Sequence, residues 1–293
     1  MRALIISGGG SKSAFAGGVA EYLLEVKRED YDIYVGTSGG SLIIPFLALG
    51  EVNRLKKILT NLEQKDVFNV NPFIIKEKEG KLQVAINHIN TLWMFLRRRK
   101  TFGESGHLLE LIKKNFSLAN FETLKTSHKR LVVTVSNLTR NLVEYKYLAD
   151  CTYEQYCHWI WASANLVPFM SLYVHEGQEY ADGGFGSLVP IHEAIILGAK
   201  QLDVIVLNPR VQDIEKPPSQ NAFNVMLSSI DFMLDQIGNN DQVIGMLESR
   251  YTGLKIRFFH TPYNLTNNSF VFRPEQMRRW WQEGYEYARL KMH

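Results

Sequence analysis

One serine lies in a setting that suits a nucleophile. Gly36-Thr37-Ser38-Gly39-Gly40 fits the pattern G-x-S-x-G, in which a serine lies at a sharp turn between a strand and a helix. Residues 32–35 before it read as a strand, and residues 41–49 after it read as a buried helix. The N-terminal N–H groups of that helix, with Gly39 as one donor, would point at an oxyanion beside Ser38 Oγ. The pattern favours attack on a carbonyl, and the alternative is a glycine-rich loop with an incidental serine.

A second glycine-rich loop could supply further oxyanion donors. Gly8-Gly9-Gly10 ends the first predicted strand, and adjacent loops of a parallel sheet open at the same edge. Each amide donor there is worth about a hundredfold in rate, and Lys12 would add a positive charge. A nucleotide-binding loop fits less well, because residues 8–13 lack the third glycine of G-x-G-x-x-G and Lys12 lacks the glycine that precedes a Walker lysine.

The candidate base is the aspartate of Asp182-Gly183-Gly184, which follows a predicted strand at 179–181. Asp-Gly alone is more often a turn signal. A serine nucleophile nevertheless needs a base. A carboxyl group with an ordinary pKa of about 3.9 is a weak base unless it is held close to the hydroxyl and partly removed from water.

The elements that must position these residues alternate between strands and helices. This order predicts an α/β fold with a mainly parallel sheet covered on both faces and hairpins added at an edge. The range of about 54–116 is richer in charge and shows no clear strand, so it is interpreted as a helical insertion, cap or lid. The other strands are predicted at 3–7, 203–207 and 255–260, the hairpins at 131–147 and 172–181, and the helices at 14–26, 83–97, 107–116, 222–237, 242–249 and from Pro274 to about 292.

The composition fits a single folded domain over residues 1–293. Hydrophobic residues make up 45% of the chain and charged residues 22%, which is ordinary globular usage. The net charge of +3 indicates no nucleic-acid partner. Cys151 and Cys157 indicate neither a disulfide framework nor a metal site, and we expect no metal or cofactor. The beginning of the chain leaves no room for a signal peptide and no apolar run is long enough to span a bilayer, so we expect a cytoplasmic protein that could contact membranes peripherally.

The three motifs, in this order, resemble those of the patatin-like phospholipases. The matching residues are Leu4 to Lys12, Gly36 to Ser41 and Asp182 to Gly184, and Trp161 to Phe169 also looks like the segment that precedes the family's aspartate strand. The resemblance is strong over 3–50 and 128–208 and thin elsewhere. It implies a patatin-like three-layer sandwich.

The resemblance also implies a chemistry and roles for single residues. It implies a Ser-Asp dyad that hydrolyses acyl esters of phospholipids, lysophospholipids or neutral lipids without a metal. By the same carry-over Ser38 is the nucleophile and Asp182 its base, Gly9 and Gly10 form the oxyanion hole, and Lys12 matches a basic position. Ser13 departs from the family, which usually has glycine there.

Three alternatives stay open. A histidine could complete a conventional Ser-His-Asp triad, and the candidates are His175, His192 and, as the best-placed late one, His260. The turn that carries Ser38, called the nucleophile elbow, nevertheless comes early in the chain for an α/β-hydrolase. A Rossmann-like nucleotide binder predicts an acidic residue where the Thr37-Ser38 elbow stands. A noncatalytic lipid-binding or scaffold protein on the same fold would have no need of both Ser38 and Asp182.

One segment of the insertion has the composition of a membrane-facing element. Leu92 to Leu96 is apolar and aromatic, and Arg97 to Lys100 is a basic run directly after it. We hypothesise a lid or membrane-docking element here. The alternative is a helix that packs on the core and ends in solvent.

Overall fold

The computed structural model describes residues 1–78, 81–210, 219 and 221–293. Within these residues, eight strands form a central sheet in the order β10-β9-β1-β2-β5-β8-β7, with β6 paired to β5. The pairs among β10, β9, β1, β2 and β5 are parallel, and the pairs of β5 with β6 and β8 are antiparallel, as is β7 with β8. The strands are β1 (Arg2–Ile6), β2 (Ile33–Thr37), β5 (Arg130–Asn137), β6 (Leu142–Tyr147), β7 (Tyr173–His175), β8 (Gln178–Asp182), β9 (Gln201–Val206) and β10 (Lys255–His260).

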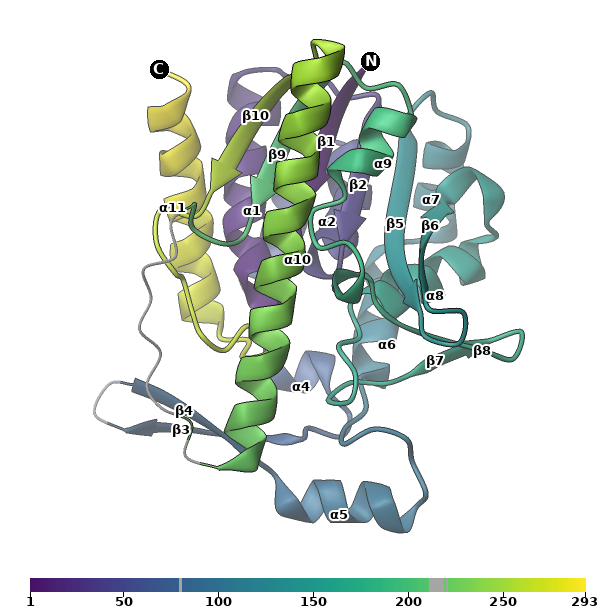
Figure 1. Cartoon of the computed structure of the whole chain (residues 1–293), viewed down its shortest axis with the longest axis vertical. Coiled ribbons are helices and arrows are strands. Elements are labelled where there is room, and N and C mark those ends of the chain that lie inside the picture. The colour runs from purple at the N-terminus through teal and green to yellow at the C-terminus, as the bar shows by residue number, and fades with distance from the viewer. Residues whose placement is uncertain (79–80, 211–218, 220) are drawn as a thin grey trace.

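Helices cover both faces of this sheet, which confirms the predicted three-layer α/β class (Figure 1). Alternate strand residues point to opposite faces, and the two sets enter two separate apolar clusters. One face carries α1 (Ser13–Glu21), α2 (Gly39–Ala48), α3 (Val52–Leu59), α8 (Tyr153–Ser163) and α11 (Pro274–Lys291), and the other carries α9 (Ile191–Ile196) and α10 (Ala222–Thr252). None of the described helices is both long and apolar enough to cross a membrane.

The range expected to be a helical insertion contains a hairpin, so the prediction that it has no strand was wrong. β3 (Phe73–Lys78) pairs antiparallel with β4 (Lys81–Ile86), between α4 (Gln64–Val67) and α5 (His88–Leu96). Apolar side chains alternate with exposed ones in both strands and pack on the main core. The helix predicted at 83–97 therefore begins only after Asn87, whose side chain accepts a hydrogen bond from Asn90 N. The insertion continues through α6 (Gly106–Asn115), and α7 (Leu118–Lys125) follows it.

The helices predicted at 222–237 and 242–249 are one helix, α10. The residues that suggested a break include Gly238, but a Cβ atom there would lie 2.9 Å from Leu188 Cδ2. A second glycine of the helix makes a similar approach, since a Cβ atom on Gly245 would lie 2.6 Å from Ile191 Cγ2. These glycines let the helix lie close against the segment that follows Asp182, and a close approach rather than a turn explains them.

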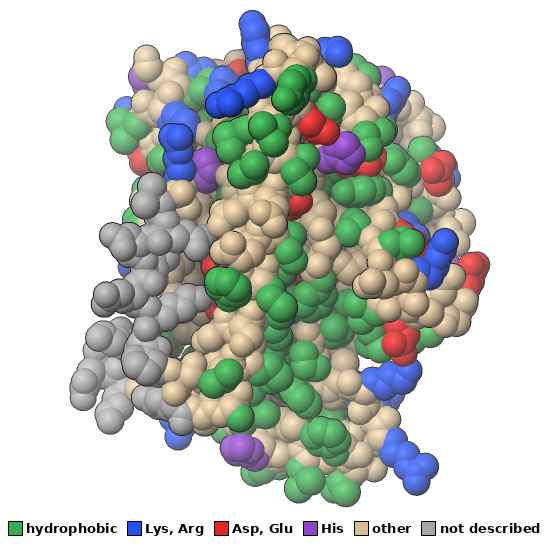
Figure 2. Space-filling view, in the orientation of Figure 1, with side chains coloured by type: hydrophobic (Ala, Val, Ile, Leu, Met, Phe, Trp, Pro, Cys, Tyr) green, Lys and Arg blue, Asp and Glu red, His purple; other side chains and the backbone are tan. Residues whose placement is uncertain are grey.

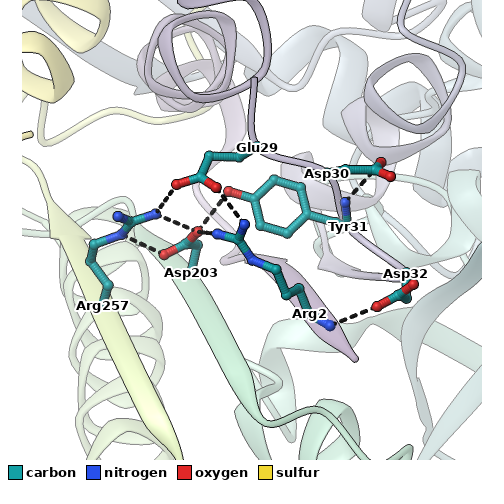
Figure 3. Close-up of polar contacts among 7 residues, drawn as sticks. All are labelled: Arg2, Glu29, Asp30, Tyr31, Asp32, Asp203 and Arg257. Carbon is teal, nitrogen blue, oxygen red and sulfur yellow. Dashed lines mark hydrogen bonds and ion pairs between the residues drawn. The ribbon is translucent and has the colours of Figure 1, made fainter. Parts of the chain in front are cut away.

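A partly buried ionic cluster joins the edge strand β10 to the next two strands, β9 and β1. Asp203 on β9 accepts hydrogen bonds from Arg257 Nε at 2.6 Å, Arg257 Nη2 at 2.7 Å and Tyr31 Oη at 2.7 Å. Glu29 bonds both Arg2 and Arg257, and the hydrogen bond from Arg2 lowers the pKa of Glu29. Figure 3 shows both arginines turned toward the two carboxylates. The cluster therefore links β1, β9, β10 and the loop before β2.

Replacing Asp203 should destabilise the fold. Asp203 is only 4% exposed, so Asp203→Asn would leave two partly buried arginines sharing one carboxylate. We expect a loss of about 3 kcal/mol in the free energy of unfolding, measured by urea denaturation. The control is Glu286→Gln, which removes the exposed pair with Arg289 and should change stability little. Equal stability of the two variants would show that the cluster contributes little.

Candidate active site

Strand β5 brings Ser38 and Asp182 together because β2 and β8 share one of its edges. Thr37 at the end of β2 pairs with Thr134 of β5, and Asp182 at the end of β8 pairs with the next residue, Val135. The other edge of β5 is occupied by β6 over the same stretch. The end of β8 therefore meets the end of β2, and Ser38, the residue after Thr37, lies beside Asp182.

Ser38 occupies a strained turn that the surrounding residues hold in place. Its backbone has φ 52° and ψ −123°, a left-handed φ that a residue with a side chain rarely adopts. The Ser38 N–H donates to Ser163 Oγ at 2.9 Å, and Ser41 Oγ donates to Ser38 O at 2.6 Å. A Cβ atom on Gly40 would lie 2.3 Å from Ile6 O, and one on Gly36 would lie 2.7 Å from the carbonyl carbon of Gly40. The glycines of the motif thus permit the sharp strand-to-helix turn.

Asp182 is buried and directed at the serine. Ser38 Oγ donates to Asp182 Oδ2 at 2.6 Å, and the N–H of Gly184 donates to Asp182 Oδ1 at 2.8 Å. Burial raises the pKa of the Asp182 carboxyl to about 7, although these two hydrogen bonds favour the charged form. Gly183 is required beside it, since a Cβ atom there would lie 2.3 Å from Thr134 O. A carboxylate with a pKa near neutrality, in contact with a hydroxyl, can act as a general base.

The two glycine-rich loops meet beside Ser38. A Cβ atom on Gly39 would lie 3.1 Å from Gly10 N, so the loops are in contact. Gly10 has φ +53° and packs against Ser269 O, which leaves no room for a side chain. Among the described residues, the N–H groups of Gly9, Gly10 and Gly39 have no hydrogen-bond acceptor, whereas that of Gly8 donates to Leu188 O. The three N–H groups can therefore serve an oxyanion.

Lys12 and Ser13 also lie at this junction. Lys12 is buried, and its Nζ donates to Asn208 Oδ1 at 2.6 Å. Ser13, the departure from the family pattern, is buried against Gly39, and its hydroxyl has no hydrogen-bond partner in the described chain. The serine fits without displacing the glycine loop, because Gly39 has no side chain to compete for the space.

A cavity of about 100 Å³ opens onto this group of residues. Gly8, Gly9, Gly10, Ser38, Gly39 and Asp182 all line it. One wall is apolar and includes Leu42, Leu62, Leu108, Leu166, Met170 and Phe272. Another part is polar and includes Lys12, Asn208 and Asp235. The cavity thus combines the candidate reacting groups with an apolar surface.

The candidate histidines lie elsewhere. His260 bonds Gln242 Oε1 at 2.7 Å, and burial lowers its pKa to about 4. His192 pairs with Glu248, and His175 stacks on Tyr173. In the described part of the chain, no histidine lines the cavity, and no three His, Cys, Asp or Glu side chains are grouped as a metal site requires.

Several residues that support the site were not predicted from the sequence. Ser163, which accepts the Ser38 N–H, lies in the family-like segment from Trp161 to Phe169, and that resemblance was the only signal for it. Asn208 follows β9 and carried no motif. Asp241 on α10 accepts the N–H of Val189 at 2.8 Å and so holds the loop after Asp182. Burial raises the pKa of Asp241 to about 6.

Comparison with known proteins identifies a family and a similar fold. A family model described as patatin-like phospholipase matches residues 4–195, which include all three motifs. The crystal structure of VipD from Legionella pneumophila is similar, with a TM-score of 0.54 and 15% sequence identity over 99% of this chain. The match spans 66% of the VipD chain, and at this identity it shows the fold alone. No curated protein matches the chain.

Burial of Asp182 should make stability depend on pH. The pKa of Asp182 is raised from 3.8 to about 7 in the folded state, so the folded protein binds this proton more tightly than the unfolded chain. The buried charge therefore destabilises the protein above about pH 7, and this cost disappears as the pH falls toward 3.8. Asp182→Asn should be more stable than wild type in urea denaturation at about pH 8, with an advantage that shrinks in acid. A stability difference that does not change with pH would contradict this account of the carboxyl group.

Proposed function

The chain belongs to the patatin-like phospholipase family, and we propose that it is a serine acyl hydrolase that cleaves fatty-acyl esters of lipids through Ser38 and Asp182. Members of this family act on lipid substrates. The observation that carries the proposal is the 2.6 Å hydrogen bond from Ser38 Oγ to a buried carboxylate whose pKa lies near neutrality. A noncatalytic scaffold would have no use for a strained serine held against a buried charge.

The proposed reaction has two halves. Ser38 Oγ attacks the ester carbonyl carbon while its proton passes to Asp182 Oδ2. The tetrahedral intermediate collapses, the bond to the alcohol breaks, and the alcohol leaves with the proton from Asp182. Water then gives a proton to Asp182 and attacks the acyl-enzyme, and the second collapse releases the fatty acid and returns the proton to Ser38. The carboxylate thus acts as base and acid in turn.

The glycine loops supply the electrostatic part of this proposal. The negative charge that develops on the carbonyl oxygen would accept hydrogen bonds from the N–H groups of Gly9, Gly10 and Gly39. These groups have no acceptor in the described chain and line the same cavity as Ser38. Asp182 Oδ1 stays bonded to Gly184, which keeps Oδ2 directed at the hydroxyl.

The shape of the site supports a long apolar acyl group as the substrate. The apolar wall of the cavity is continuous with a second cavity, because Leu42, Leu62 and Leu108 line both. The second cavity lies among α2, α3 and α6 and is almost wholly apolar; its further lining includes Phe46, Leu55, Leu59, Ile112 and Phe116. An acyl chain that extends from Ser38 past Leu62 would remove apolar surface from water. The polar part beside Lys12 and Asn208 would face the alcohol side of the ester.

Loss of either member of the pair should abolish turnover without unfolding. Ser38→Ala removes the nucleophile and Asp182→Asn removes the base, so each should lower kcat/KM on phospholipid and p-nitrophenyl ester substrates by about a thousandfold or more. Circular dichroism should show an intact fold in both. The matched controls are Ser229→Ala and Asp150→Asn. Both residues are exposed, so these variants should retain full turnover. Retained activity in Ser38→Ala would place the nucleophile elsewhere.

A further inference from the structure

Helix α5 presents an apolar surface to solvent. Ile89 is 80% exposed, Leu92 59%, Phe95 61% and Leu96 76%, whereas Met94 on the opposite side is 1% exposed and anchors the helix. Monomeric proteins rarely leave such contiguous apolar side chains in water unless the surface binds something. The helix therefore packs through one narrow side and leaves the other uncovered.

A basic run follows this surface directly. Arg97, Arg98, Arg99 and Lys100 are all exposed, and the segment 87–100 contains no Asp or Glu. Arg97 lies over the Trp93 ring at 3.8 Å, so it belongs to the same surface. In the described part of the chain, neither Arg97 nor Arg98 forms an ion pair with an acidic side chain.

The other two bases are partly neutralised. Arg99 Nε lies 3.3 Å from Glu104, and Lys100 Nζ lies 2.5 Å from Glu179 on the β7–β8 hairpin. Their side chains are nevertheless 57% and 67% exposed. The surface consequently keeps an excess of positive charge beside its apolar side chains.

The surface lies at the end of the molecule where the cavity is built. β1, β2 and β5 run toward that end, and Ser38 follows the last residue of β2 (Figure 1). Figure 1 shows α5 beyond this end of the sheet. Figure 2 shows hydrophobic side chains over α5, with Lys and Arg side chains beside it.

We propose that the α5 surface, defined as Ile89, Leu92, Trp93, Phe95 and Leu96 with the bases of 97–100, docks the protein onto a membrane that carries anionic lipids. Exposed apolar side chains on an amphipathic helix insert at the boundary of head groups and acyl chains. Bases beside them are attracted to a negative membrane surface. A neutral protein groove would satisfy the apolar side chains but not the charge, so charge complementarity selects the anionic membrane. The proposed function supplies only the reason why docking would be useful to this protein. Membrane binding itself requires no ester hydrolysis.

Vesicle co-sedimentation tests the docking. In the Ser38→Ala background, the protein should bind vesicles of phosphatidylcholine mixed with phosphatidylserine better than vesicles of phosphatidylcholine alone, and added salt should weaken binding. The double variant Arg97→Gln, Arg98→Gln should lose about 25-fold in affinity for the mixed vesicles, because each charge contributes about fivefold. Leu92→Ser combined with Leu96→Ser should lose at least about tenfold on both vesicle types.

The matched control is Ile196→Ser combined with Leu290→Ser. These side chains are 62% and 70% exposed on α9 and α11, toward the opposite end of the molecule, so vesicle binding should be unchanged. An equal loss in this control would overturn the proposal, as would equal binding of wild type to both vesicle types. A change of oligomeric state in the Leu92→Ser, Leu96→Ser variant, with vesicle binding kept, would assign the surface to a second copy instead.

Turnover of a short soluble ester separates docking from catalysis. With Ser38 intact, the α5 variants should keep wild-type turnover of that ester and lose activity on mixed vesicles. Equal losses on both substrates would overturn docking. If wild type binds mixed vesicles through α5 but hydrolyses no ester, the proposed function fails while the docking proposal stands.

Discussion

A carboxyl group held away from water beside a hydroxyl is the constraint around which this molecule is built. Asp182 is 3% exposed and has only two hydrogen-bond donors to its side chain, Ser38 Oγ and the N–H of Gly184, in the described structure. Burial without a cationic partner is unfavourable for the charged form, and it brings the pKa of the carboxyl to about 7. The same burial that destabilises the charge gives the basicity that the proposed reaction needs. The rest of the fold keeps the pair in contact.

Backbone geometry, more than side-chain contacts, maintains that arrangement. Pairing with β5 fixes the positions of both Thr37 and Asp182 along the sheet. A shift of register in either strand pair would therefore separate the serine from its base. The elbow at Ser38 is strained, and Ser163 and Ser41 hold its N–H and carbonyl groups from α8 and α2. The ionic cluster around Asp203 ties β9 to β10 and to the loop before β2, the strand that leads into Ser38. Strain at the site is thus supported by a rigid scaffold.

The parts of this site that depend on local sequence were predictable. The glycines around Ser38 and at residues 8–10 indicated sharp turns after strands, because few other residues permit them. The contact between Ser38 and Asp182 was expected from chemistry and family resemblance, but its cause, the shared edge of β5, depends on pairings between distant segments. Ser163 lies 125 residues from its partner Ser38, so no local pattern marks it. The β3–β4 hairpin was missed because two of its exposed positions hold apolar residues, Ile74 and Ala85, which blur the alternation. The helix α10 was divided in two because Gly238 serves close packing instead of a turn.

Covalent labelling of Ser38 measures directly whether Asp182 activates it. A fluorophosphonate attacked by Ser38 Oγ loses fluoride and leaves a stable adduct that peptide mass spectrometry can locate. We expect the adduct on Ser38, at a rate that rises with pH through an apparent pKa of about 7, and far slower labelling in Asp182→Asn. An adduct on another residue, or a labelling rate on Ser38 that is the same in wild type and Asp182→Asn, would contradict the account.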